Sequence, residues 1–250
     1  MIWRANIKAK WVFTAISAIA GAIVGAEAVM HPHGGLLTST IEPWFVRHGL
    51  SSSARFEAYD TAIRGNIDRL LPGIVIYVLF SLYWMIASRN RADDANAHPS
   101  PYGLHKFLVN VSLLLICLPL PGFTLRLLPA SALLLAVGIG FELAGVALAV
   151  AARRSLGRNW SREVRIAVGH ELVQSGPYAC IRHPIYTGAI LISCGLAIQS
   201  GLVSALVGIA VLVLAYLRKI GQEERMLGSA FGAAFDQYRA RSWALIPFLI

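Results

Sequence analysis

Three clusters of charged and aromatic residues in the last third of the 250-residue sequence are suited to binding a small charged ligand. The first is RHPIYTG, residues 182–188, where Pro184 predicts the first turn of a helix because a missing N–H costs nothing there. The amides and dipole of a helix start attract anionic groups. His183 and Tyr186 are three residues apart and face the same side, and Gly188 leaves room for a ligand to approach the backbone. Basic and aromatic residues are also common at a membrane interface.

The second cluster is the acidic pair Glu223-Glu224, shortly after Arg218 and Lys219. We expect it at the start of an amphipathic helix, Gln222–Arg239, where acids are ordinary partners of the helix dipole. The alternative is functional: a carboxylate here binds a cationic group of a ligand.

The third cluster is Tyr238-Arg239-Ala240-Arg241, followed by Trp243 and Pro247. The planar fork of an arginine binds a carboxylate through two hydrogen bonds, which lysine cannot do. A basic residue that reaches from an apolar surface to the membrane interface explains the same pattern without a ligand.

The elements that must position these clusters are membrane helices. The sequence is 56% hydrophobic and 14% charged, and its mean hydropathy is +0.62, whereas soluble domains have about 25% charged residues. The formal net charge is +9, but the basic residues gather in short loops beside apolar runs, which favours membrane orientation over nucleic-acid binding. The three cysteines have no metal-ligand spacing, so we expect no metal.

A span requires about 20 mostly apolar residues. We predict an all-α, polytopic transmembrane bundle of about six spans, the last two forming a short hairpin at Ser200-Gly201, followed by the amphipathic helix. The first span has features of a cleavable secretory signal, but five further spans favour an uncleaved helix. We divide the chain into N-terminal spans, residues 1–151, and a functional core, residues 152–250. The predicted spans are Trp11–Met30, Leu70–Ser88, Leu104–Leu120, Ser131–Ala151, Ile185–Gln199 and Leu202–Leu217.

The distribution of basic residues predicts cytoplasmic N- and C-termini. With this orientation only five of the 22 Lys and Arg residues lie outside: Arg47, Arg55, Arg64, Arg69 and Arg126. Compact loops and the lack of a retention signal favour a bacterial inner membrane. The outer segment 31–69 is expected to include a short interfacial helix near Ser53–Asp68.

Glu142 is the acid nearest the middle of a predicted span. Carboxylates within a membrane usually face a cavity or the bundle interior, so Glu142 either contacts substrate or is a protonated or hydrogen-bonded packing residue. Gly138 and Gly140 begin a dinucleotide-binding pattern, but Leu143 replaces its third glycine and no strand precedes it. We expect these glycines to allow close helix packing.

The ordered set of motifs resembles the isoprenylcysteine carboxyl methyltransferase family over about residues 156–247. The order is GPY, RHPIYTG, a short apolar hairpin, EE, FG, Y-x-x-R and a proline. The resemblance implies an integral-membrane methyltransferase with S-adenosyl-L-methionine in a cytoplasmic pocket. It places Arg182 and Arg241 near the reactive carboxylate, gives Glu224 a catalytic role, and indicates Asn159 and Trp243 as substrate contacts. The cofactor contacts that it implies are Leu172, Val173, Gly176, Tyr178, His183, Pro184, Tyr186, Gly188, Glu223 and Glu224.

Methyl transfer to a carboxylate requires alignment, which supplies ~7–11 kcal/mol, and no general base, because a carboxylate is ionised at neutral pH. The membrane location implies a lipophilic acceptor, such as a prenylated cysteine or another lipid-like carboxylate. Three alternatives stay open. A phospholipid N-methyltransferase acting on phosphatidylethanolamine would need a base, such as His183 or Glu142. The others are a membrane reductase with a nicotinamide cofactor and a non-catalytic membrane or transport protein.

Overall fold

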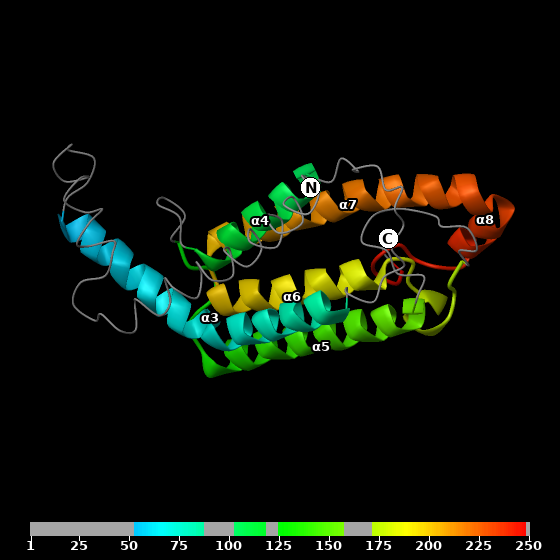
Figure 1. Ribbon diagram of the computed structural model, residues 1–250. Helices are drawn as coiled ribbons and strands as arrows, with labels where there is room; N and C mark the ends of the chain where they lie inside the picture. Colours follow the sequence, from blue (N-terminus) through cyan, green and yellow to red (C-terminus); the bar gives the residue numbers. More distant parts are fainter. Residues whose placement is uncertain (1–52, 88–102, 119–124, 158–171, 249–250) are drawn as a thin grey trace, which may run out of the picture.

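The structure, a computed structural model, describes residues 53–87, 103–118, 125–157 and 172–248 (Figure 1). Within these ranges the chain forms helices and one 3-10 turn, and no strand, which confirms the all-α prediction. The elements are α3 (Ser53–Ala87), α4 (Gly103–Cys117), α5 (Ala132–Leu156), η3 (Gly176–Ala179), α6 (Pro184–Ser200), α7 (Val203–Phe231) and α8 (Ala233–Ala240).

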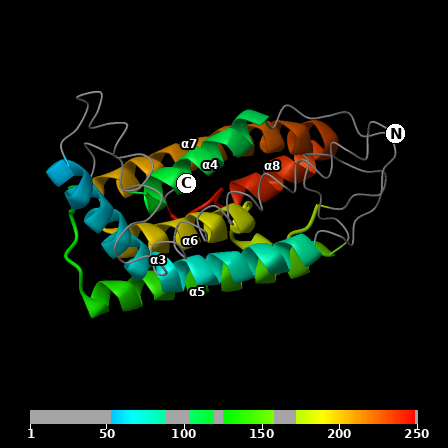
Figure 2. The ribbon, with the colours of Figure 1, turned by 60° about the vertical axis from the view of Figure 1, so that its left-hand side comes forward.

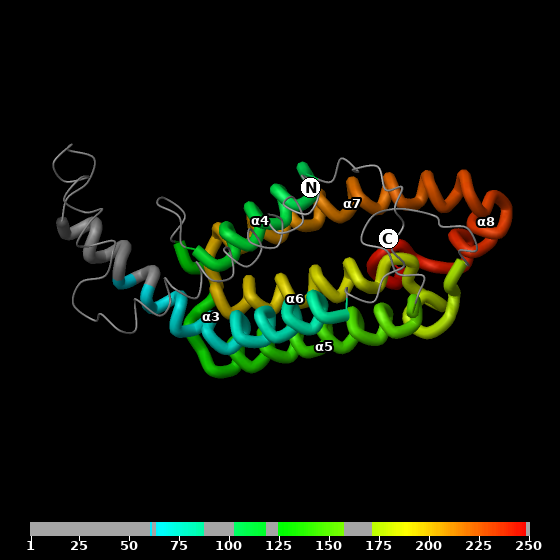
Figure 3. Tube along the Cα trace, viewed as in Figure 1, coloured from blue at the N-terminus to red at the C-terminus, as the bar shows by residue number. Residues whose placement is uncertain are grey.

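The long helices lie in two groups. Helices α5 and α6 pack along each other more extensively than any other described pair, with α3 beside them, and α4 packs along α7 (Figures 1 and 2). Helix α8 and the C-terminal segment lie near the end of α7 and the start of α6 (Figure 3). The start of α6 and the last part of α7, whose residues are about 40 positions apart along the chain, therefore meet at this end of the bundle.

Three described helices are long and apolar enough to cross a membrane, namely Arg64–Ala87, Ala132–Leu156 and Val203–Phe231. Helices α4 and α6 are apolar but shorter, at 15 and 17 residues. Each predicted span from the second to the sixth thus corresponds to an apolar helix. The first, Trp11–Met30, lies outside the described residues.

Two predicted helix boundaries are wrong. Residues 53–68 are not a separate interfacial helix but the first part of the continuous helix α3. The last span does not stop at Leu217, because α7 continues to Phe231. The residues between are mainly strong helix formers, including Glu, Arg, Met and Leu, and the helix ends only at Gly232, where φ is 50°.

The predicted hairpin between α6 and α7 is confirmed. Helix α6 ends at Ser200, and Gly201 adopts a left-handed conformation with φ of 64°, which glycine tolerates without strain. The Gly201 carbonyl accepts hydrogen bonds from the N–H groups of Leu127 and Leu128, so the turn is tied to the segment before α5.

Glycines bring the backbones of α5 and α6 into close contact. A Cβ atom on Gly195 would lie 2.4 Å from the Gly138 carbonyl oxygen, and one on Gly188 would lie 2.6 Å from that of Gly145. The packing role is therefore confirmed for Gly138, whereas a Cβ on Gly140 would meet nothing within 4 Å among the described residues. Gly188 also differs from expectation, because its open side faces α5 and is not left for a ligand.

Candidate functional site

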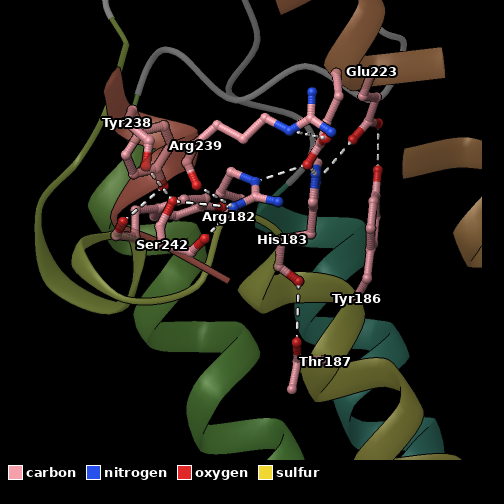
Figure 4. Close-up of polar contacts among 10 residues, drawn as sticks. Arg182, His183, Tyr186, Thr187, Glu223, Tyr238, Arg239 and Ser242 are labelled. Atoms are coloured by element: carbon pink, nitrogen blue, oxygen red, sulfur yellow. Dashed lines mark hydrogen bonds and ion pairs between the residues drawn. The ribbon is translucent and has the colours of Figure 1, made fainter. Parts of the chain in front are cut away.

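The structure brings the RHPIYTG segment and the acidic pair together (Figure 4). Pro184 is the first residue of α6, as predicted, and His183 is the residue before it. Glu223 and Glu224 do not start a helix; they lie in the last third of α7. The prediction that they stand at the start of their own helix is therefore wrong, and both carboxylates instead contact residues at the start of α6.

His183 lies between the two carboxylates. Its Nδ1 atom is 3.4 Å from Oε2 of Glu223, and its Nε2 atom is 3.3 Å from Oε1 of Glu224. Burial alone would lower the pKa of His183, but the hydrogen bonds and charges of the two carboxylates outweigh it and raise the pKa. Both ring nitrogens thus face acceptors, which favours the imidazolium form.

Tyr186 holds Glu223 from the other side. The Tyr186 hydroxyl donates a hydrogen bond to Oε1 of Glu223, and the ring stacks parallel to His183 with centroids 5.6 Å apart. The second face-to-face neighbour of Tyr186 is Tyr216 of α7, at 4.8 Å. Lys219 Nζ is 3.9 Å from Oε1 of Glu223. The prediction that His183 and Tyr186 face the same side is therefore confirmed.

Arg182 links Glu224 to the C-terminal segment. Its Nε atom donates to Oε1 of Glu224 at 2.8 Å. Its Nη1 atom donates to the carbonyl oxygens of Ser242 and Arg239, the latter at 3.2 Å. Only 9% of the Arg182 side chain is exposed. The guanidinium is therefore firmly held by the protein's own groups.

The two arginines at the end of α8 have different partners. Arg241 does not contact the acidic pair in this structure; its Nη2 atom donates to Oε1 of Gln174. Arg239, which is not among the predicted site residues, places Nε 3.7 Å from Oε2 of Glu224. The Y-x-x-R spacing of the resemblance selects Arg241, and the sequence has no comparable signal for Arg239. The end of α8 at Ala240 explains the difference, since only Arg239 is still helical.

The C-terminal segment covers the start of α6 through backbone pairing. The N–H of Trp243 donates to the Cys180 carbonyl, and the Trp243 carbonyl accepts from the N–H of Arg182 at 2.7 Å. The N–H of His183 donates to Ala244 O, and Thr187 Oγ1 donates to Leu245 O at 2.8 Å. The two amides just before α6 are thus occupied by the chain itself. The Trp243 ring packs on Phe248, with centroids 4.7 Å apart.

The expected cofactor contacts around η3 lie beside this cluster. Leu172 and Val173 are half-buried, and Gly176 has φ of 60° with a Cβ position 2.4 Å from Oγ of Ser155 on α5. The carbonyl of the buried residue Tyr178 accepts a hydrogen bond of 2.7 Å from the Tyr238 hydroxyl. Burial raises the pKa of Tyr238 to about 12, so this donor keeps its proton. Asn159 lies outside the described residues.

Glu142 lies far from the cluster. It is fully buried, and its Oε1 atom accepts a hydrogen bond of 2.7 Å from Nε2 of Gln199. Gln199 is thirteen residues beyond Tyr186 on α6, which corresponds to about 20 Å along the helix. Of the two roles considered for Glu142, this geometry matches the hydrogen-bonded packing residue.

Comparison with known proteins gives matches in the same region. Residues 137–229 match the sequence model of the isoprenylcysteine carboxyl methyltransferase (ICMT) family. A protein-S-isoprenylcysteine O-methyltransferase of Schizosaccharomyces pombe is 31% identical over 136 residues, which are 53% of this chain and 57% of that relative. The chain therefore matches a little over half the length of this curated relative.

A solved structure has the same fold. It is that of the eukaryotic intramembrane Ras methyltransferase ICMT, with a TM-score of 0.55 and 18% sequence identity over 93% of this chain and 94% of that one. The family match includes both RHPIYTG and the acidic pair, whose side chains meet in the structure. Over its described residues the chain is thus an all-helical integral membrane protein, and its residues 137–229 are similar to the isoprenylcysteine carboxyl methyltransferase family.

Proposed function

We propose that the protein is an integral-membrane, S-adenosyl-L-methionine-dependent methyltransferase that methylates the carboxylate of an isoprenylcysteine or a similar lipophilic acceptor. One observation carries the proposal. Within the family-matched region, the His183–Tyr186 turn and the Glu223-Glu224 pair, about 40 residues apart in sequence, form one polar cluster at the end of an apolar helix bundle.

The residues of the cluster fit the charges of the cofactor. S-adenosylmethionine has an α-ammonium group and, when bound, supplies the methyl group from its sulfonium. Glu223 and Glu224 would hold the ammonium. His183, Tyr186 and Arg182 fix the two carboxylates, while their other cationic partners are distant, Lys219 at 3.9 Å and Arg239 at 3.7 Å. A ligand ammonium at hydrogen-bond distance would outcompete such long pairs.

The geometry favours an acceptor that needs no base. An amine acceptor must lose a proton, and His183 was the candidate base for that reaction. Both nitrogens of His183 face carboxylates, whose hydrogen bonds and charges raise its pKa in spite of burial, so the ring is poorly placed to accept a proton from an amine. Glu142, the other candidate, is engaged with Gln199 far from the cluster. A carboxylate is ionised at neutral pH and can be methylated without either residue.

The length of α7 supports a site at a surface of the membrane. Glu223 is twenty residues beyond Val203, and a rise of about 1.5 Å per residue gives about 30 Å, the thickness of the hydrocarbon core. With both termini inside, the cluster faces the cytosol of what we propose is a bacterial cell. Cys180 is exposed at this end. A membrane-impermeant thiol reagent should label Cys180 in permeabilised cells only. Labelling in intact cells would show that the cluster faces the outside and would contradict the proposed orientation.

Product analysis tests the proposed reaction. Purified protein receives methyl-labelled S-adenosylmethionine together with either N-acetyl-S-farnesyl-cysteine or phosphatidylethanolamine. We expect label on the farnesyl-cysteine, released as methanol by mild alkali as for an ester. Glu224→Gln should lower the rate by at least about tenfold, whereas Asp236→Asn, an exposed acid on α8, should not change it. Alkali-stable label on the phospholipid would replace this proposal with N-methylation.

A further inference from the structure

Three arginines near the acidic pair differ in how firmly their guanidinium groups are held. Arg182 donates to Glu224 and to two backbone carbonyls and is 9% exposed. Arg241 hydrogen-bonds to Gln174. Arg239 has an ion pair with Glu224 at 3.7 Å, and its side chain is 62% exposed. Of the three, Arg239 is therefore the one that is both at the acidic pair and accessible to a second carboxylate.

Arg182 is poorly suited to bind an acceptor. To reach an incoming carboxylate it would have to give up Glu224 or the carbonyl of Ser242, and each loss would leave a poorly solvated group without a partner. Those bonds also fix the C-terminal segment over the start of α6. The structure gives Arg182 a positioning role.

Arg239 loses less than Arg182 when it leaves Glu224. An exposed ion pair is worth little because water screens it and the long side chain loses entropy in forming it. Figure 4 shows the side chain extending from α8 across the cluster toward the carboxylates of α7. Its contact is with Oε2 of Glu224, the oxygen that neither Arg182 nor His183 contacts. This is the oxygen most open to a cationic ligand.

We propose that Arg239 binds the carboxylate of the methyl acceptor and becomes free to do so when a ligand ammonium takes its place on Glu224. The inference rests on the proposed function and adds the identity of the acceptor-binding cation. It also couples the two ligands. Because coupling free energies are reciprocal, the cofactor strengthens acceptor binding by the same factor by which the acceptor strengthens cofactor binding.

The test compares two acceptor ligands, N-acetyl-S-farnesyl-cysteine and its carboxamide, which differ in charge but share the lipid tail. Their dissociation constants are measured with and without saturating S-adenosylhomocysteine, which retains the α-ammonium and transfers no methyl group. For the wild type we expect N-acetyl-S-farnesyl-cysteine to bind about tenfold more tightly than its carboxamide when S-adenosylhomocysteine is present. Without S-adenosylhomocysteine we expect a smaller preference.

Variants assign this preference to a residue. Arg239→Gln should abolish it, while Arg239→Lys should retain part of it, because lysine keeps the charge but loses the planar fork. Arg225→Gln, an exposed change beside Glu224, should behave as wild type. A purely structural role for Arg239 would weaken both ligands equally.

The outcomes separate this inference from the proposed function. If Arg239→Gln keeps the full preference, or Arg241→Gln loses it instead, Arg239 is not the acceptor-binding cation, although the methyltransferase assignment stands. If the wild type binds neither the nucleoside nor either acceptor ligand, the proposed function fails and this inference fails with it.

Discussion

At the residue scale, the cluster depends on one imidazole between two carboxylates. The three-residue spacing of His183 and Tyr186 at a helix start predicted that they share a face, and they do. The partner of each His183 nitrogen is set by α7, 40 residues downstream, and local spacing has no information on such a contact. The choice between Arg239 and Arg241 depends on where α8 ends, which the sequence leaves uncertain by a few residues.

The raised pKa of His183 makes stability depend on pH. A group whose pKa is higher in the folded state stabilises that state fully below its unfolded pKa of about 6.5, and the contribution is lost as pH rises through the folded value. The midpoint of thermal unfolding in detergent should therefore fall as the pH is raised above about 6.5.

The pH effect is measured against His183→Gln, which has no titrating ring. We expect the variant to unfold at a lower temperature at about pH 6 and to lose much of the wild type's fall at higher pH. Parallel pH curves for the two proteins would show that His183 is not a proton-bearing partner of the acidic pair.

At the scale of elements, apolar length predicted which segments are helices but not how far they continue. The prediction ended the last span near Leu217, where hydropathy falls. The backbone stays helical to Phe231 because the residues that follow Leu217 are polar but mainly strong helix formers. Gly188 illustrates a second limit. A glycine that admits a ligand and one that admits a neighbouring helix look alike in a sequence, and only the contact with Gly145 separates them.

The α5–α6 contact predicts a large difference between two substitutions on one helix. Gly145→Ala would place a Cβ 2.5 Å from the Gly188 carbonyl oxygen, so the backbones must separate, at a cost of about 1–3 kcal/mol. Gly140→Ala meets nothing within 4 Å and should be neutral or stabilise the helix by up to about 1 kcal/mol. Denaturant unfolding in detergent measures both, and equal effects would contradict the close packing.

At the scale of the whole molecule, the membrane class followed from composition, but the assembly of the site did not. The RHPIYTG segment, the acidic pair and the C-terminal segment meet because α6 and α7 form a hairpin and the chain then turns back through α8 to pair with residues 180–183. Hydrophobic patterning predicts spans one at a time. Only the ordered resemblance to a known family brought these segments together before the structure did.

Binding of the cofactor's amino group tests the central claim most directly. Calorimetric titration compares S-adenosylhomocysteine with its deaminated analogue on the wild type, Glu224→Gln and Asp236→Asn. We expect the wild type and Asp236→Asn to prefer the ammonium form by about tenfold or more, and Glu224→Gln to lose that preference. Equal preference in all three proteins would contradict the assignment of the acidic pair as the site of the ammonium group.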